Sequence, residues 1–366
     1  MSAPVRIVVI GGCGNFGARI CRRLMPEAGL EIVATSRAEY AVGPGGARTA
    51  RLDLDSASFT ADLAALHPDI VIHCAGPFQG QDYRVALASL ACGAHYLDLA
   101  DAREFVARFA AALDAPARTA HRVALSGAST LPALSSAVVD HFSAHFEQLE
   151  SIEMYIAPGQ HAPRGAATMA AVLSYAGRPF RWMIGGGWQT VHGWQALVRV
   201  NFVFGRRWAA ACDVPDLELF PRAFPGVRTV TFRAALEVAS QHWALWALAG
   251  LRRAGLPLPL SRWAAGFNRL GTWLNRFGSA CGGMRVDLGG QVAGRGSGGI
   301  SWQLIARGNH GPEIPCIAAI LMALKLARGA AVPEGAGPCL GLLSLPEFET
   351  EFARWDIRMQ VQSTSP

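Results

Sequence analysis

The chain has 366 residues, of which 51% are hydrophobic and 16% are charged, and this composition excludes an intrinsically disordered protein. The formal net charge is +6, but the basic residues are scattered in runs of no more than two, so we expect no nucleic-acid binding. The length is that of two domains rather than one.

The eight cysteines form no Cys-x-x-Cys motif and have no histidine at the spacing of a metal site. We therefore expect reduced thiols, no metal centre and a cytoplasmic location. The amino terminus does not look like a signal peptide, because its apolar stretch at residues 7–10 runs directly into glycines. No stretch provides the roughly 18 uncharged apolar residues that a bilayer span requires.

Short apolar runs alternate with helical patterns over the first 130 residues. The runs predict strands at residues 5–10, 31–35, 49–54, 70–73, 95–97 and 122–125. The patterns between them predict helices at residues 16–25, 56–66, 83–92 and 102–113. Strands that are apolar on both faces and are separated by helices indicate βαβ units, so we expect an α/β fold with a doubly wound parallel sheet.

The first strand runs into a glycine-rich turn, Gly12-Cys13-Gly14-Asn15-Phe16-Gly17, which fits the pattern G-x-G-x-x-G. In this pattern the first glycine allows a tight turn, the second lets the backbone approach a pyrophosphate, and the third lets the helix pack closely on the strand. The amino end of the following helix offers N–H groups to the phosphates. The turn therefore predicts a dinucleotide site, with a glycine turn that binds no ligand as the alternative.

The end of the second strand indicates which dinucleotide is bound. An NAD site usually has an acidic residue here for the ribose hydroxyls, but the sequence reads Ala34-Thr35-Ser36-Arg37. Arg37 can pair with a 2′-phosphate through two hydrogen bonds, and Ser36 can donate another. We expect NADP(H), with NAD(H) as the alternative cofactor and an ordinary surface arginine as the alternative role of Arg37.

The fourth strand ends at Cys74 and is followed by the turn Ala75-Gly76-Pro77-Phe78. In a doubly wound sheet the carboxyl end of this strand lies beside the ribose and nicotinamide of the cofactor. Gly76 permits a close approach, and Pro77 stiffens the turn. We expect these five residues to line the nicotinamide side of the site.

Three motifs, the Gly-Gly-x-Gly-x-x-Gly start, "CAGPF" and "ACGAHYLDL", together resemble the saccharopine dehydrogenase-like NAD(P)-binding proteins, which include saccharopine reductases and trans-acting enoyl reductases. The resemblance covers residues 5–130 and extends more loosely to "SGASTLPALSS" and the "GPEIPCIAAILMALKLARG" tail. It implies a Rossmann domain at residues 1–130, an inserted α+β domain at 131–310, and a segment at 311–366 that packs back on the first domain.

The same resemblance assigns site residues. It implies pyrophosphate contacts from the glycine turn (Gly12, Gly14, Asn15, Phe16 and Gly17), ribose contacts from Ser36 and Arg37, and nicotinamide contacts from Cys74, Ala75, Gly76, Pro77 and Phe78. One departure is Ala100-Asp101, where relatives often carry Gly-Glu. The resemblance therefore extends to the cofactor and not to the substrate.

The fifth strand, "HYLDL", supplies candidate proton donors because it too ends at the cofactor edge of the sheet. Five residues near the predicted strand ends are candidates: His95, Tyr96, Asp98, Asp101 and Ser129. Of these, His95, Tyr96 and Asp98 are the catalytic assignment. Alternate residues of a strand face opposite sides, so packing or capping is the alternative role for each of them. A Tyr-x-x-x-Lys pair is excluded, because no tyrosine stands four residues before Lys325, the only lysine.

The second domain carries nine of the ten tryptophans, a composition that suits an apolar substrate. Arg164 in "PGQHAPRGAATM" and Trp188 in "FRWMIGGGWQTVHGW" are candidate substrate residues. A structural loop arginine and a hairpin with tryptophan in the core are the respective alternatives. The tryptophan-rich segment 234–266 is compatible with an interfacial membrane helix or with a buried or dimer-interface helix.

These features predict a cytoplasmic, homodimeric NADP(H)-dependent oxidoreductase with an apolar small-molecule substrate in the cleft between its domains. Hydride would pass between the nicotinamide and a C=O, C=N or C=C bond. Two alternatives remain, a non-catalytic dinucleotide-binding sensor or scaffold, and a reductase associated with a membrane surface or with lipid.

Overall fold

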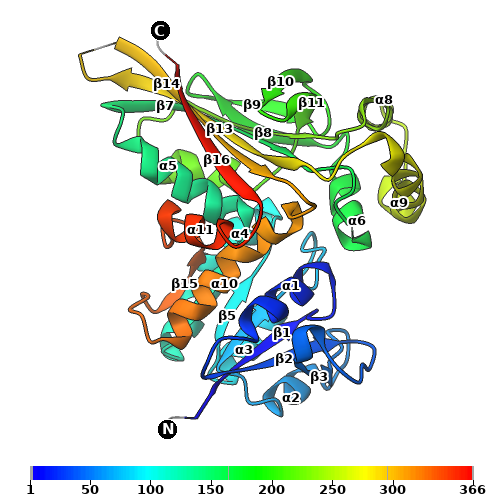
Figure 1. Cartoon of the computed structure of the whole chain (residues 1–366), viewed down its shortest axis with the longest axis vertical. Helices are drawn as coiled ribbons and strands as arrows, with labels where there is room; N and C mark the ends of the chain where they lie inside the picture. Colours follow the sequence, from blue (N-terminus) through cyan, green and yellow to red (C-terminus); the bar gives the residue numbers. More distant parts are fainter. Residues whose placement is uncertain (1–2, 164, 295, 365–366) are drawn as a thin grey trace. The chain divides into compact units, whose positions relative to one another are not determined.

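The structure is a computed structural model that describes residues 3–163, 165–294 and 296–364. The chain divides into two compact units, each built from two stretches of sequence. Figure 1 labels the helices and strands and colours them from the amino to the carboxyl terminus. The first unit comprises the residues up to Leu134 together with Glu313–Leu343. The second comprises Ser135–Pro312 together with the residues from Ser344 onward.

Seven strands of the described chain form the sheet of the first unit, in the order β15-β6-β5-β4-β1-β2-β3, and every neighbouring pair is parallel. The strands are β1 (Val5–Ile10), β2 (Leu30–Ser36), β3 (Arg48–Arg51), β4 (Ile70–His73), β5 (His95–Asp98), β6 (Val123–Ser126) and β15 (Gly335–Pro338). The order reverses between β1 and β4, which is the arrangement of the Rossmann fold. The prediction of a doubly wound parallel sheet is confirmed.

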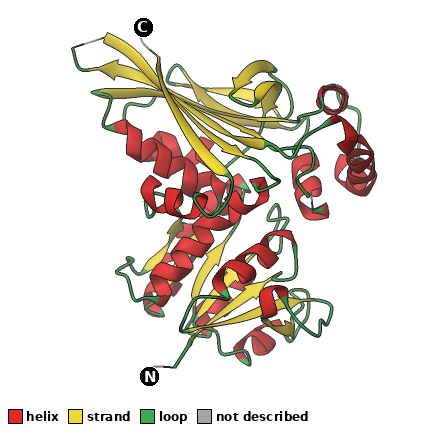
Figure 2. Ribbon diagram, viewed as in Figure 1, coloured by secondary structure: helices red, strands yellow, loops and turns green. Residues whose placement is uncertain are grey.

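Helices follow the strands and cover both faces of this sheet, as the secondary-structure view in Figure 2 shows. They are α1 (Asn15–Leu24), α2 (Phe59–Ala64), α3 (Arg84–Ala91) and α4 (Arg103–Thr119). Because both faces are covered, all four residues of β4 are buried. Helix α1 buries Gly17, Ile20, Cys21 and Leu24, which recur at helical spacing on one side.

The segment 313–343 belongs to the first unit although it lies far along the chain. Helix α10 (Ile314–Ala327) contacts α1, β4 and β5, and β15 adds a parallel strand beyond β6. Arg19 on α1 forms an ion pair with Glu313 at 3.0 Å. The helix is apolar around most of its circumference, which explains why most of its side chains are buried.

The residues after 343 do not follow the expectation that the whole segment 311–366 returns to the first unit. Strand β16 (Ile357–Thr364) pairs antiparallel with β14 (Gly296–Ala306) of the second unit, with Trp302 opposite Val361. Helix α11 (Leu345–Phe352) contacts α5 (Ser135–Ser143) of the same unit. The expectation is wrong here because the edge of β14 offers a full ladder of hydrogen-bond partners to an alternating strand.

Nine strands of the described chain form the second sheet, in the order β10-β11-β12-β7-β13-β14-β16, with β8 beside β12 and β9 beside β8. The further strands are β7 (Gln148–Ala157), β8 (Pro179–Ile184), β9 (Gly187–His192), β10 (Val198–Phe202), β11 (Gly205–Ala211), β12 (Thr229–Ala235) and β13 (Gly282–Val292). One face carries buried apolar residues such as Met154, Val286 and Trp302, which lie side by side in the register. Helix α5 contacts β7 and β13.

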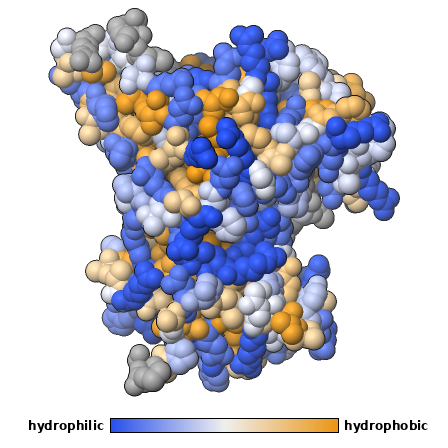
Figure 3. Space-filling view, viewed as in Figure 1, coloured by the Kyte–Doolittle hydropathy of each residue, from blue (hydrophilic) through white to orange (hydrophobic). Residues whose placement is uncertain are grey.

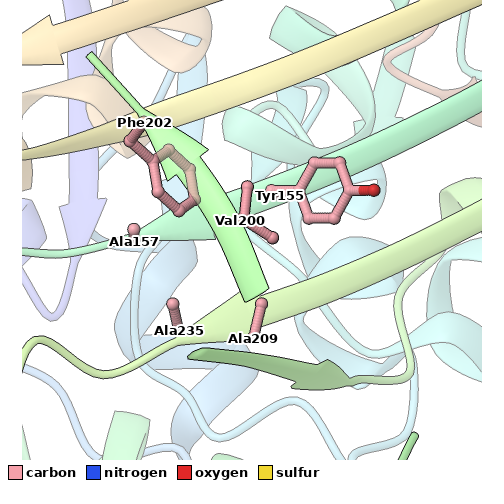
Figure 4. Packing of buried hydrophobic residues seen from close by; sticks show 6 residues of the cluster. All are labelled: Tyr155, Ala157, Val200, Phe202, Ala209 and Ala235. Carbon is pink, nitrogen blue, oxygen red and sulfur yellow. The ribbon is translucent and has the colours of Figure 1, made fainter. Parts of the chain in front are cut away.

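A second apolar cluster lies where β10 and β11 meet the middle of this sheet, and Figure 4 shows its side chains. Its members are Tyr155, Ala157, Val200, Phe202, Ala209 and Ala235. Tyr155 follows Met154 on β7 and therefore points to the opposite face. The sheet thus buries apolar side chains on both faces at this point.

The remaining helices of the second unit are α6 (Ala166–Ser174), α7 (Asp216–Ala223), α8 (Ala239–Arg253) and α9 (Ala264–Trp273). Among the described residues we find no helix with the length and apolar character that crossing a membrane demands.

Candidate dinucleotide site

The glycine turn after β1 is packed too tightly to carry side chains at two of its positions. A Cβ atom on Gly17 would lie 2.3 Å from the carbonyl oxygen of Gly11, and one on Gly12 would lie 2.7 Å from Cα of Ala34. Both of these nearest atoms belong to the backbone, so a side-chain rotation cannot relieve the clash. The sequence pattern is therefore explained by close packing of α1 and β2 against the turn.

The amino end of α1 suits an anion. Gly14 is the N-cap and is extended, with φ −81° and ψ −178°, and it has no side chain to cap the helix. The first turn of α1 contains no acidic residue. The first N–H groups of a helix and its dipole attract negative charge, so the uncapped end fits the pyrophosphate of a dinucleotide.

The carboxyl ends of β2 and β3 carry two exposed arginines. Arg37 follows β2, and Arg51 ends β3 directly opposite Ser36 in the register. Neither arginine has a hydrogen bond or ion pair that we find within the described residues. The hydroxyl of Ser36 donates to the carbonyl of Ala38, so it is engaged with its own loop. Arg51 was not predicted from the sequence, because only the pairing of β2 with β3 brings it to Ser36.

The turn after β4 lies against the glycine turn. The backbone N–H of Cys74 donates to the carbonyl of Ile10 at 2.9 Å, and a Cβ on Gly11 would lie 3.2 Å from the nitrogen of Ala75. Cys74, Ala75 and Gly76 are half-buried, and Pro77 is exposed. The structure therefore brings together the two turns that the sequence analysis selected separately.

Phe78 differs from its neighbours in this turn, because its ring points into the core. The ring is buried and lies 5.0 Å from the imidazole of His73 and 5.5 Å from the ring of Phe105, measured between centroids. Phe78 was predicted to lie beside the nicotinamide. Its ring instead packs in the core and holds the turn in place through these aromatic contacts.

His73 and Gln81 fix the shape of this turn, and the sequence analysis missed both. Nε2 of His73 is 3.1 Å from Oε1 of Gln81, and the N–H of Ala75 donates to Nδ1 of His73 at 3.4 Å. The imidazole is therefore neutral, with its proton on Nε2. Burial lowers its pKa to about 4. The available signal was a histidine as the last residue of an otherwise aliphatic strand.

Asp98 organises the carboxyl end of β5. Its Oδ1 accepts hydrogen bonds from the hydroxyl of Ser126 at 2.9 Å and from the N–H groups of Gly127 and Ala100 at 2.8 and 2.9 Å. Burial raises the pKa of the carboxyl to about 6 despite these bonds. The side chain is fully buried, so it holds the loop after β6 rather than meeting a substrate.

The other two catalytic candidates are not placed to donate a proton to a substrate. His95 is the first residue of β5, at the edge of the sheet opposite the two turns, and its Nδ1 accepts the N–H of Val123 at 3.0 Å. Tyr96 is fully buried and stacks on Phe109 at 5.8 Å, and burial raises the pKa of its hydroxyl. These two predictions are corrected: His95 lies at the wrong end, and Tyr96 belongs to the core.

The two substrate candidates belong to the second unit. Arg164 lies outside the described residues. Trp188 is on β9 and is 38% exposed, with the guanidinium of Arg181 5.3 Å from its ring. The surrounding glycines form the turn of the β8–β9 hairpin, and Trp182 on β8 is buried. The role of Trp188 stays a prediction.

Comparisons with known proteins bear on the fold that carries these residues. A model of the NAD dependent epimerase/dehydratase family matches residues 7–119, which contain the glycine turn, the arginine end of β2 and the β4 turn. No curated protein sequence matches the chain.

Two solved structures share the whole architecture. Saccharopine dehydrogenase (L-Glu forming) from Saccharomyces cerevisiae has a TM-score of 0.65 at 10% identity, covering 98% of this chain and 100% of that one. Homospermidine synthase from Legionella pneumophila, solved in complex with NAD, has a TM-score of 0.62 at 10% identity, covering 99% and 92% of the two chains. The resemblance drawn from the sequence is thus confirmed at the level of the fold, and the chain has the fold of saccharopine dehydrogenase.

Proposed function

We propose that this protein is an NAD(P)-dependent oxidoreductase acting on an apolar small molecule. The observation that carries the proposal is the contact between the glycine turn after β1 and the Cys74–Phe78 turn after β4, at the point where the strand order reverses. When bound there, the dinucleotide would supply or accept a hydride for a C=O, C=N or C=C bond.

The chain's own residues would bind and orient the cofactor. The uncapped end of α1 would hold the pyrophosphate, and the His73–Gln81 pair would keep the β4 turn in its bound shape before the cofactor arrives. Asp98 would fix the neighbouring loop at Ser126 and Gly127. These are positioning roles, since His73 and Asp98 are buried.

For proton exchange we propose Asp101. It follows β5 at the same edge of the sheet, the residue is exposed, and its Oδ1 accepts the amide of Gln79 at 3.3 Å. Desolvation of the carboxyl by its neighbours raises its pKa, which favours a role as a proton donor. An exposed carboxylate within reach of the reacting atom can exchange a proton directly or through water. Replacement of Asp101 by asparagine should lower turnover and leave the Kd of the cofactor unchanged.

We further propose that NADP(H) is preferred over NAD(H). Support comes from two exposed arginines beside Ser36, the last residue of β2: Arg37 follows it in the chain, and Arg51 lies opposite it at the end of β3. A guanidinium can bind the 2′-phosphate through two N–H groups, whereas a ribose 2′-hydroxyl gains little from a cation.

A titration with NADPH and then with NADH tests both proposals. Binding is measured by energy transfer from tryptophan to the nicotinamide. NADPH should bind in the micromolar range. Replacing Arg37 by alanine should raise the Kd of NADPH by at least about tenfold to a hundredfold, since each charge-assisted hydrogen bond contributes that much, and leave the Kd of NADH unchanged. Arg51→Ala should act in the same direction.

The matched control is Arg48→Ala. Arg48 begins β3 at the opposite edge of the sheet, is 61% exposed and pairs with Glu31. This change should leave both Kd values as they are.

If neither dinucleotide binds or raises the melting temperature, the proposed function is wrong. If both bind equally and Arg37→Ala has no effect, only the NADP(H) preference is wrong. Oxidation of NADPH in a screen of apolar ketones, imines and enoyl compounds would exclude a non-catalytic sensor.

A further inference from the structure

The segment between Glu237 and Asp287 has an unusual charge pattern. Its 49 residues, 238–286, contain six arginines and no aspartate or glutamate. It includes α8, the short helix η3 (Leu260–Trp263), α9 and the short helix η4 (Leu274–Phe277), all within the second unit. Four of the six arginines, Arg253, Arg262, Arg269 and Arg276, are exposed, and exposed arginines in a segment without acidic residues attract an anionic partner.

Large apolar side chains are exposed along the same segment. The exposed fractions are 47% for Leu251, 45% for Leu256, 42% for Trp263, 56% for Trp273 and 62% for Phe277. Single exposed apolar residues are common on protein surfaces, but a group of this size marks an interaction site. In the space-filling view of Figure 3, hydrophobic and hydrophilic side chains lie next to one another over this part of the second unit.

The exposed residues follow helical spacing. Arg269, Trp273, Arg276 and Phe277 stand at positions i, i+4, i+7 and i+8, which places them on one side of α9 and η4. The guanidinium of Arg276 lies 3.9 Å from the ring centroid of Trp273 and 4.8 Å from that of Phe277. Helix α9 also contacts α6, which holds it to the unit.

Helix α8 has the same division into a buried and an exposed side. His242, Leu245 and Ala249 are buried, while Trp243 and Leu251 are exposed and stand two helical turns apart. Arg253 is exposed just beyond Leu251. Both long helices of the segment therefore present aromatic or aliphatic side chains together with arginines.

We propose that this basic aromatic face, formed by Leu251, Leu256, Trp263, Trp273 and Phe277 with Arg253, Arg262, Arg269 and Arg276, docks on an anionic phospholipid surface. Tryptophan and phenylalanine rings insert at the boundary between headgroups and acyl chains, and arginines bind the phosphates while their stems stay in the apolar layer. The proposal is independent of the dinucleotide site.

Charge distinguishes lipid from the other occupants. A second copy docked through the same face would bring arginines against arginines, because the segment has no acidic residue to pair with them. A nucleic acid would meet the arginines but would gain nothing from the exposed leucines. An anionic bilayer satisfies both the arginines and the apolar side chains.

Co-sedimentation of the full-length protein with vesicles tests the proposal. One set is phosphatidylcholine alone, and in the other a third of the lipid is phosphatidylglycerol. The protein should sediment with the anionic vesicles and be released by high salt. Replacing Arg269 and Arg276 by glutamine should weaken binding about fivefold for each arginine. Replacing Trp273 and Phe277 by serine should weaken it at least about tenfold.

Two exposed residues elsewhere give matched controls. Arg358→Gln removes an arginine whose side chain is 73% exposed on β16, and Val42→Ser removes an apolar residue that is 71% exposed in the first unit. Neither should change vesicle binding. Unchanged melting curves and unchanged NADPH binding would show that every variant is folded.

Three results would overturn the proposal: no sedimentation with anionic vesicles, equal sedimentation with neutral vesicles, or no effect of either double variant. A fourth contradicting result would come from sedimentation velocity. If the double variant Trp273→Ser, Phe277→Ser converts a dimer into a monomer, and the wild-type protein does not bind vesicles, the face is an interface between copies.

Discussion

Nε2 of His73 lies 3.1 Å from Oε1 of Gln81, and the amide nitrogen of Gln81 donates to the carbonyls of Ala75 at 2.9 Å and Pro77 at 2.8 Å. A single side chain therefore ties the last residue of β4 to both ends of the turn that follows it. Backbone groups in such a turn have no strand or helix partners, so the amide of Gln81 satisfies them instead.

Replacing Gln81 by leucine should loosen this turn. We expect a Kd for NADPH about tenfold higher, because the turn would have to be ordered on binding. The free energy of unfolding should fall by about 2–4 kcal/mol, the net value of the three hydrogen bonds that the Gln81 side chain makes. Fluorescence titration and urea unfolding measure the two effects. Gln189→Leu, at an exposed position of β9, is the control, and an equal loss of affinity in that variant would contradict the argument.

Replacing Gly17 by alanine should disrupt the glycine turn. The added Cβ would stand 2.3 Å from the carbonyl oxygen of Gly11 and 2.7 Å from Cα of Gly12, so α1 would have to move away from the turn. We expect loss of dinucleotide binding and a loss of about 1–3 kcal/mol of stability. Gly311→Ala is the matched change, since no atom lies within 4 Å of its added Cβ. Normal binding in Gly17→Ala would refute the packing argument.

Replacing Asp98 by asparagine should change how stability depends on pH. Burial raises the pKa of this carboxyl to about 6 from 3.8, so between these values the folded state holds more protons than the unfolded state. Stability contributed by Asp98 is therefore lost as pH rises through this window, by roughly 3 kcal/mol in total. Asparagine keeps an oxygen that accepts these hydrogen bonds and has no charge at any pH, so its contribution to stability should not change over this window.

The wild type and Asp98→Asn should accordingly be similar in stability near pH 4, and the variant should be the more stable one above pH 6. Denaturant unfolding at a series of pH values measures the difference. Asp216→Asn provides a second test of the same kind. Burial raises the pKa of Asp216 to about 7, so the stability difference between this variant and the wild type should keep growing up to about pH 7. A difference that is constant with pH would mean that folding does not change the pKa of Asp98.

Replacing Glu237 by glutamine should destabilise the second unit. Burial disfavours its charge, but hydrogen bonds from Ser279 and Gln160 and the nearby Arg207 outweigh this and lower the pKa. Arg207 is 3.2 Å away and has only 5% of its side chain exposed, so the variant would leave a buried cation unpaired. We expect a loss of about 3–5 kcal/mol.

The comparison for this variant is Glu218→Gln, which breaks the surface pair of Glu218 with Arg222. That change should cost less than about 1 kcal/mol, because the Arg222 side chain is 70% exposed. Thermal unfolding of the two variants side by side measures the contrast. Similar melting temperatures would show that Arg207 finds other partners among the carbonyls it already contacts.

The sequence predicted the first sheet well, because its signals are local. Strands β1 and β4 match the predicted residues 5–10 and 70–73, since each is an aliphatic run bounded by turn residues. The tail was assigned less well. The alternation of apolar and polar residues at 357–362 is a strand signal, but which sheet receives it depends on the free edge of β14, and no local pattern encodes that edge.

The cofactor turns were found from the sequence because glycines mark close backbone approach. The catalytic candidates were resolved less well. The direction of a parallel strand places its last residues at the cofactor edge, but a strand pattern does not tell which of those side chains is buried in the core. His95 and Asp98 stand three residues apart and lie at opposite ends of β5. His73 and Gln81 were missed since their bond joins a strand to a loop eight residues later.

Helix α10 and strand β15 complete the first unit from residues 313–343, so 178 residues of the second unit are synthesised in between. At roughly 5–20 residues per second, the missing pieces leave the ribosome about 10–40 s after β6. Until then the outer edge of β6 and the side of α1 that meets Cys316 stay uncovered on the nascent chain. The dinucleotide fold, although encoded first, is therefore completed only after most of the second unit has been synthesised.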